Sequence, residues 1–127
     1  MSEQTRALIQ THWKLANARN WSEFADLLHP SLIYEVPQTR EYIDGGQGYL
    51  EMFSTWPGDW AASIKHLVCE EAKAVCVIDF VVGAEVMTGI SMFELNSGLI
   101  TKVTDYWPEP YEPPARVTPH MKRRPPE

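Results

Sequence analysis

Residues 86–95 (VMTGISMFEL) and residues 99–107 (LITKVTDYW) decide the fold, because apolar and polar side chains alternate along both runs as they do in β-strands. Asn96-Ser97-Gly98 lies between the two runs, and its glycine stands where a three-residue hairpin loop needs a left-handed backbone. Residues 62–70 and 74–82 form two further strand-like runs. We therefore expect a sheet in the second half of the chain, with the nearly uninterrupted apolar run 74–82 covered on both faces.

The first third of the chain has helical periodicity. Apolar and aromatic side chains recur at three- and four-residue spacing on one face of a first helix: Leu8, Ile9, His12, Trp13, Leu15 and Ala16. Asn20 and Glu23 resemble a capping box that opens a short second helix, which His29-Pro30 ends. Residues 32–36 are a strand, and a third helix begins near Asp44.

Three helices followed by about four to six strands indicate an α+β fold. We expect the helices to pack into the concave face of a curved sheet, forming a cone-shaped barrel with a small-molecule cavity at its mouth. Most prolines follow the last strand: Pro108, Pro110, Pro113, Pro114, Pro119, Pro125 and Pro126. Residues 1–115 are therefore expected to form a single domain, followed by a basic, proline-rich tail over residues 116–127.

Length and charge exclude several classes of protein. The 127 residues are 44% hydrophobic and carry a formal net charge of −6, so we expect a globular protein without nucleic acid as a partner. No apolar run reaches the ~18 residues of a membrane span, and the N-terminus lacks the pattern of a signal peptide. These features predict a cytoplasmic protein with no membrane partner.

Two cysteines, Cys69 and Cys76, would stand opposite each other if Ala72-Lys73 were a two-residue turn. A cross-strand disulfide and two free thiols are both compatible with this arrangement, and a reducing compartment favours the thiols.

The order of these elements resembles the nuclear transport factor 2-like superfamily, and within it the SnoaL-like, polyketide-cyclase-like branch. The resemblance covers roughly residues 4–114 and is carried by three stretches: residues 34–41 (YEVPQTRE), 56–60 (WPGDW) and 104–107 (TDYW). It implies a cone-shaped α+β fold and frequent homodimers through the outer face of the sheet. Members include isomerases, cyclases, dehydratases, epoxide hydrolases and non-catalytic proteins, so the fold alone does not give the function.

Asp105 is the first candidate catalytic residue. A three-residue loop at Asn96-Ser97-Gly98 would place Ser91 opposite Val103 and put Asp105 on the same, concave face as Phe93. A carboxyl group among apolar side chains has a raised pKa that suits proton transfer. The resemblance implies the same role, because an Asp on the last strand transfers protons in the cyclases and epoxide hydrolases. The alternative is a structural Asp with a backbone or arginine contact.

Asp79 is the second candidate, because it interrupts an otherwise uncharged strand. Together with Asp105 it could provide a pair of acids like that of ketosteroid isomerase, in which one carboxyl group stays neutral and the other acts as the base. The first helix has no tyrosine to match the oxyanion donor of that enzyme. The resemblance to epoxide hydrolases would need an Arg two residues before the Asp, where this chain has Val77. The alternative for Asp79 is an ion pair at a dimer face.

The remaining polar candidates are His66, His12 and Arg40. Either histidine could be a base or a hydrogen-bond donor to a substrate carbonyl, although a hydrogen-bonded core histidine is the commoner role. Their spacing predicts no metal site. Arg40 could hold an anionic group of a substrate or pair with Asp59, and we favour the ion pair.

Aromatic side chains predict the walls of the cavity, although filling of the core is their commoner role. The predicted ligand-binding residues are Trp13, Tyr34, Arg40, Phe53, Trp56, Phe93, Trp107 and His12. We expect an enzyme that needs no cofactor and moves a proton in a largely apolar carbonyl compound. A non-catalytic ligand-binding protein and a protein-assembly scaffold are the alternatives.

Overall fold

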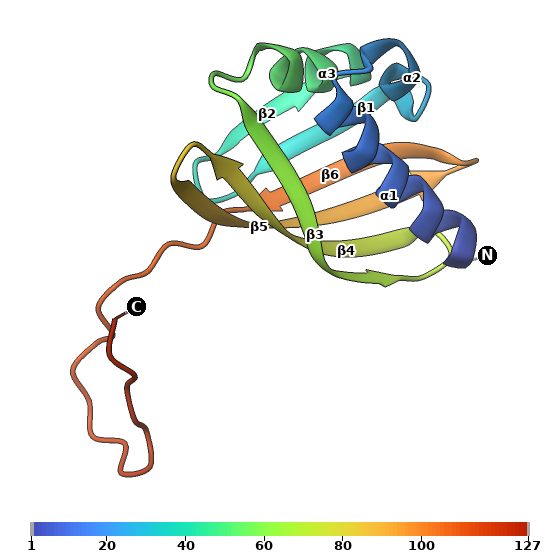
Figure 1. The fold of residues 1–127 in the computed structure, drawn as a ribbon. Helices are drawn as coiled ribbons and strands as arrows, with labels where there is room; N and C mark the ends of the chain where they lie inside the picture. The colour runs from blue at the N-terminus through green and yellow to red at the C-terminus, as the bar shows by residue number, and fades with distance from the viewer. Residues whose placement is uncertain (1, 127) are drawn as a thin grey trace.

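The computed structural model describes residues 2–126 (Figure 1). Its elements follow the expected order of two helices, a strand, a third helix and four strands, except that an additional short strand over residues 41–44, which the sequence pattern did not predict, precedes the third helix. In chain order they are α1 (Ser2–Ala18), α2 (Trp21–Ala25), β1 (Leu28–Val36), β2 (Glu41–Asp44), α3 (Gly46–Thr55), β3 (Trp60–Cys69), β4 (Lys73–Val82), β5 (Glu85–Asn96) and β6 (Leu99–Tyr106). The α+β fold class is confirmed. No helix within residues 2–126 is long and apolar enough to cross a membrane.

The second helix is shorter than expected: it ends at Ala25, a turn at residues 26–27 follows, and His29-Pro30, the expected end of the helix, lies inside β1. The face of α1 that carries Ile9, Trp13 and Ala16 is buried, as its periodicity predicts. The side chain of Asn20 accepts a hydrogen bond from the backbone N–H of Glu23 and so caps α2. The third helix, α3, is capped by the backbone of Gly45, one residue after the expected Asp44.

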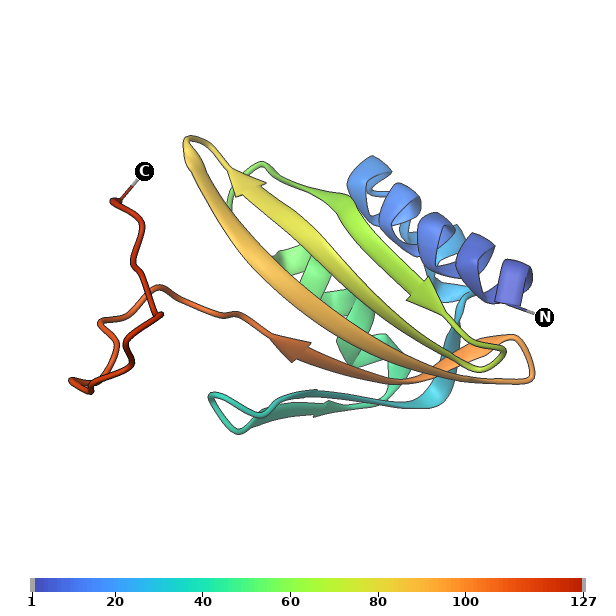
Figure 2. The same cartoon turned by 90° about the horizontal axis from the view of Figure 1, so that it is seen from below.

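The sheet is mixed and open, with strand order β2-β1-β6-β5-β4-β3. Antiparallel pairs make up most of it, but β1 and β6, which are far apart in the sequence, pair in parallel. Because β2 and β3 are both edge strands, the sheet curves around the helices without closing into the expected barrel (Figure 2). Tyr34 on β1 and Val103 on β6 are direct neighbours in the parallel pair.

The hairpins differ in register from the sequence expectation. Asn96 pairs with Leu99 across a two-residue turn, and a bulge at Thr101 then places Ser91 opposite Asp105 instead of Val103. At the other hairpin, Cys69 pairs with Ala74, and both cysteines are free thiols. Bulges are non-local features that a loop length read from the sequence does not reveal.

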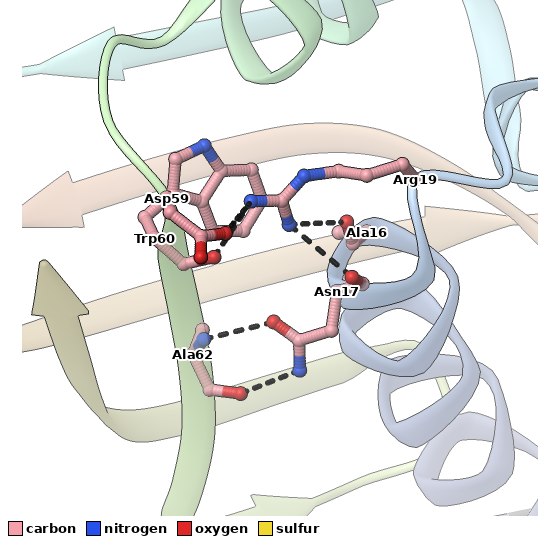
Figure 3. A network of polar contacts seen from close by, with 6 residues as sticks. All are labelled: Ala16, Asn17, Arg19, Asp59, Trp60 and Ala62. Carbon is pink, nitrogen blue, oxygen red and sulfur yellow. Dashed lines mark hydrogen bonds and ion pairs between the residues drawn. The ribbon is translucent and has the colours of Figure 1, made fainter.

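The core lies between the helices and the concave face of the sheet, where α1 contacts β3 and α3 contacts β1. Figure 3 shows how the end of α1 is attached to the edge strand β3: the Asn17 amide bonds both backbone polar groups of Ala62, at 2.7 and 2.8 Å. Arg19 stacks its guanidinium 3.9 Å above the ring of Trp60 and donates to the Trp60 carbonyl at 2.7 Å. These contacts hold Trp60 against Phe80, a wall residue of the site described below.

Residues 108–126 leave the end of β6 and extend away from the sheet (Figures 1 and 2). All of them are exposed, and Arg123 donates two hydrogen bonds to Glu112, at 3.0 and 2.6 Å, that fold this segment back on itself.

Candidate functional site

Asp105 lies at the centre of the concave face of the sheet, where three strands each contribute one polar side chain. It sits on β6, only 5% exposed, between β5 and β1. Ser91 of β5 donates a hydrogen bond to Asp105 Oδ1 at 2.6 Å. Tyr34 of β1 donates to Asp105 Oδ2 at 2.7 Å. Both carboxyl oxygens therefore have a neutral hydroxyl donor, and no Lys or Arg within residues 2–126 forms an ion pair with the group.

This environment adjusts the acidity of Asp105. Burial raises its pKa to about 6, and the hydrogen bonds from Ser91 and Tyr34 act in the opposite direction because they stabilise the carboxylate. The pKa of Tyr34 is raised far above its ordinary value, first by burial and then by the negative charge of Asp105. Tyr34 therefore keeps its proton and acts as a donor, while Asp105 can gain or lose a proton near neutral pH.

Asp105 forms part of the wall of a cavity of about 180 Å³ that is otherwise mostly apolar. The lining residues are Trp13, Tyr34, Met52, Phe53, Trp56, Phe80, Met87, Asp105 and Trp107. A single ionisable carboxyl group in apolar surroundings is the usual composition of a small-molecule site, in which few polar groups orient the ligand. We call this space the inner cavity.

A second space of about 490 Å³ adjoins the inner cavity and lies beneath the turn between β1 and β2. The two spaces share four wall residues, so they lie next to each other: Tyr34, Met52, Trp56 and Trp107. The second space also has polar lining residues, namely Thr39, Arg40, Glu41 and Tyr42. We call it the outer cavity.

Trp107 stands at the boundary of the two cavities, and its position depends on two residues that the sequence did not indicate. A Cβ atom on Gly89 would lie 2.8 Å from the Trp107 ring, so only glycine lets this ring lie against β5. The side chain of Gln38 bonds the backbone N–H and carbonyl of Trp107, at 2.5 and 3.3 Å. Met52 and Met87 were also missed as wall residues, because a flexible apolar side chain carries no functional signal in a sequence.

His12 is fully buried in the aromatic core and does not line either cavity. Its Nε2 lies 2.7 Å from the hydroxyl of Tyr49, and burial lowers its pKa to about 3. The ring is therefore neutral at physiological pH. Phe93 is 1% exposed and packs beside His12, with ring centroids 5.2 Å apart, so it belongs to the core as well.

The other predicted catalytic residues lie away from the inner cavity. Asp79 is on the opposite face of the sheet from Asp105, where its Oδ1 lies 3.8 Å from the ammonium group of Lys65, so the expected pairing of the two acids does not occur. His66 is exposed, because a register shift between Ile64 and His66 turns it away from the concave face. The period-two pattern would have kept these two β3 residues on one face.

Arg40 is exposed at the wall of the outer cavity and does not form the ion pair that we favoured. Asp59, the expected partner, instead lies 3.9 Å from Arg19, whose position at the end of α1 brings it beside β3. Among residues 2–126, no three His, Cys, Asp or Glu side chains are grouped as metal ligands would be.

A curved mixed sheet, helices on its concave face and a buried carboxyl group in an apolar cavity together define a small-molecule-pocket protein of the nuclear transport factor 2-like class. Within that class, the chain belongs to the SnoaL-like domain family, whose sequence pattern matches residues 9–103. A search of curated proteins gives no match.

Solved structures agree with this family. A protein of Kribbella flavida, provisionally assigned as a ketosteroid isomerase, is 39% identical, with a TM-score of 0.89 over 99% of this chain and 93% of its own. An NTF2-like protein of unknown function from Burkholderia xenovorans is 22% identical, with a TM-score of 0.78 over 88% of each chain. A provisionally assigned polyketide cyclase of Xanthomonas campestris is 16% identical, with a TM-score of 0.67 over 84% of this chain and 92% of its own. The last two show the fold alone.

Proposed function

We propose that this protein is an acid/base enzyme that moves a proton within a largely apolar carbonyl compound, with Asp105 as the group that accepts and returns the proton. The observation that carries the proposal is the position of Asp105: an ionisable carboxyl group in the wall of an apolar cavity, with a pKa of about 6. A general base is most effective when its pKa lies near the working pH.

The reaction can be written with its electrons balanced. Asp105 removes a proton from the carbon next to the substrate carbonyl, and the electrons of that C–H bond form a new carbon–carbon double bond as the carbonyl oxygen becomes negative. When the substrate already has a double bond between its β- and γ-carbons, the product of this step is a dienolate. Protonated Asp105 then returns the proton to the γ-carbon, the electrons on the oxygen re-form the carbonyl, the carbon–carbon double bond moves to the α,β position, and Asp105 recovers its charge. The double bond has moved, and no group is gained or lost, so the overall reaction is an isomerisation. A cyclisation or a dehydration would share the first step.

Tyr34 has a second task in this proposal. Its hydroxyl lines the inner cavity and donates to Asp105 while the carboxylate is charged. Once Asp105 has taken the proton, the negative charge lies on the substrate oxygen, and the same hydroxyl is a neutral donor in the cavity wall next to the base. A donor that follows the developing charge favours the transition state over the ground state.

Relatives support the class of substrate. The Kribbella flavida protein, at 39% identity, is provisionally named for an isomerisation of ketosteroids, which are apolar carbonyl compounds. The alternative function is a non-catalytic ligand-binding protein, which would use the same cavity without proton transfer.

The test is isomerisation of β,γ-unsaturated ketones, followed by the ultraviolet absorbance of the conjugated product. The panel includes a small cyclohexenone and a Δ5-3-ketosteroid, and exchange of substrate protons in D₂O is followed by NMR as a second readout. We expect activity in the native protein, a loss of at least about 100-fold in Asp105→Asn, and no change in Asp79→Asn, which removes an Asp from the opposite face of the sheet. Equal activity in native protein and Asp105→Asn would overturn the proposal, and ligand binding without proton exchange would favour the alternative.

A further inference from the structure

The inner cavity is too small to hold a complete ligand of ordinary size. Its volume is about 180 Å³, whereas small-molecule sites commonly have roughly 300–1,000 Å³. The outer cavity, of about 490 Å³, adjoins it and shares Trp56 and Trp107 as wall residues. A ligand with one end against Asp105 therefore extends into the outer cavity, and the residues there contribute to its recognition.

Arg40 is the cationic residue of the outer cavity, and its backbone is strained. It ends the four-residue turn from β1 to β2, where its N–H donates to the Val36 carbonyl at 2.8 Å and its φ angle is 63°. Glycine adopts this left-handed conformation without penalty, whereas a side-chain-bearing residue of this kind holds it at a cost in stability. Arg19 and Ser97 also have positive φ angles, so the strain belongs to the turn and the role of Arg40 depends on where its side chain lies.

The arginine side chains of the protein differ in their contacts. Four other arginines donate hydrogen bonds to backbone or carboxylate oxygens: Arg6, Arg19, Arg116 and Arg123. Within residues 2–126 neither Arg40 nor Arg124 has a hydrogen-bond or ion-pair partner, and of these two only Arg40 lines the outer cavity. Guanidinium groups recognise carboxylates through two parallel hydrogen bonds, so an unpaired one at a cavity wall suits an acidic ligand group.

We propose that the outer cavity is an anion-binding subsite in which Arg40 holds a carboxylate, or an equivalent acidic group, at the far end of an elongated apolar ligand whose other end lies against Asp105. Glu41, the carboxylate that also borders this cavity, accepts a hydrogen bond from the Thr39 hydroxyl at 2.6 Å, which holds it at the turn. Its charge opposes an anion, so Glu41 weakens the subsite and Arg40 provides its attraction. This inference rests on the proposed function only in one respect, namely that the end of the ligand next to Asp105 is the end that reacts.

Two fluorescent probes with the same apolar skeleton test the subsite. Anilinonaphthalene sulfonate carries an acidic group, and N-phenylnaphthylamine lacks it. In Arg40→Gln we expect the Kd of the sulfonate to rise by about threefold to tenfold while the Kd of the neutral probe stays constant. Glu41→Gln should tighten binding of the sulfonate alone. Arg124→Gln, which removes an arginine from the exposed C-terminal segment, is the matched control and should change neither Kd.

Two further variants separate a ligand-binding role from a structural one. Arg40→Gly relieves the strain at the turn, so its melting temperature should equal or exceed that of the native protein while its preference for the sulfonate is lost. A clear fall in melting temperature would make Arg40 a structural residue and overturn the proposal. Met87→Trp fills the inner cavity and should weaken binding of both probes, because one ligand occupies both cavities.

Other outcomes also decide the question. An unchanged ratio of the two Kd values in Arg40→Gln, an equal effect of Arg124→Gln, or undiminished sulfonate binding in Met87→Trp would each overturn the elongated anionic ligand. The probes undergo no reaction, so the result is independent of catalysis. If Arg40 governs the sulfonate but Asp105→Asn retains full activity, the subsite stands and the proposed chemistry fails.

Discussion

Ser91 and Asp105 face each other across β5 and β6, and the Ser91 hydroxyl donates a hydrogen bond to Asp105 Oδ1 at 2.6 Å. The contact depends on one bulge residue, Thr101, which shifts the register of the hairpin. It matters for function because it stabilises the charged form of the carboxyl group in an otherwise apolar wall.

Removing this donor should make Asp105 a weaker acid. In Ser91→Ala the carboxylate loses a hydrogen bond, so its pKa should rise further above its ordinary value, and the acidic midpoint of the activity profile should move up by about one pH unit. Activity itself should persist at high pH. Ser63→Ala, an exposed serine of β3, is the control. A midpoint that does not move would show that Ser91 does not stabilise the base.

Asp105→Asn should stabilise the protein more at high pH than at low pH. The pKa of Asp105 is raised in the folded state, from 3.8 to about 6, so its stabilising contribution is complete below pH 3.8 and is lost as the pH rises through 6. The Asn variant has no carboxyl group to ionise, so its stability does not fall in this pH range for this reason. We therefore subtract the free energy of unfolding of the native protein from that of the variant. This difference should be about 2 kcal/mol larger at pH 8 than at pH 4. Urea titrations at both pH values measure it, and the opposite sign would mean that cations or backbone donors hold the carboxylate.

His12 should make the native protein sensitive to acid. Its pKa is lowered from 6.5 to about 3 by burial, so the unfolded chain binds a proton that the folded protein excludes. Stability from this residue is present above pH 6.5 and is lost as the pH falls toward 3, by up to about 4 kcal/mol. His12→Gln should reduce the loss of stability between pH 6.5 and pH 4, measured by denaturant unfolding. An unchanged pH dependence would indicate that His12 is protonated in the folded state.

The outer face of the sheet should form a homodimer interface. Val68, Val75 and Met92 are neighbours on three adjacent strands, and all three are exposed on the face away from the helices. An apolar patch of this kind, self-complementary about a two-fold axis, is typical of a dimer contact. Light scattering should give twice the 14.5 kDa of one chain at micromolar concentration.

Val75→Glu should shift this equilibrium toward the monomer, because it places a charge in the centre of the patch. Val117→Glu makes the same chemical change in the exposed C-terminal segment and should leave the dimer intact. A native protein that scatters as a single chain would contradict the interface.

Truncation before Thr118 should leave the melting temperature almost unchanged. Every described residue from Thr118 onward is exposed and lies away from the sheet, so its removal exposes little apolar surface (Figure 2). A fall of many degrees in differential scanning calorimetry would show that this segment packs against the body or against a second copy.

The sequence by itself determined that there are three helices, where five of the six strands lie along the chain, and on which face of the sheet Asp105 lies. These features are local: a period of 3.6 places Ile9, Trp13 and Ala16 on one side of α1, and a period of two keeps Asp105 on the face of Phe93 even when the register shifts. Five of the aromatic residues that we expected at the cavity line it, namely Trp13, Tyr34, Phe53, Trp56 and Trp107, and their contact with a ligand stays a prediction.

Only the tertiary structure decided which polar groups meet. Tyr34 reaches Asp105 because β1 and β6 pair in parallel across 71 positions of sequence, and no periodicity encodes a pairing at that distance. The bulge in β3 turns His66 outward, and the bulge at Thr101 brings Ser91 to Asp105. Each of these outcomes follows from how two strands fit the whole core, since a shift of one residue moves a side chain to the other face or to another partner.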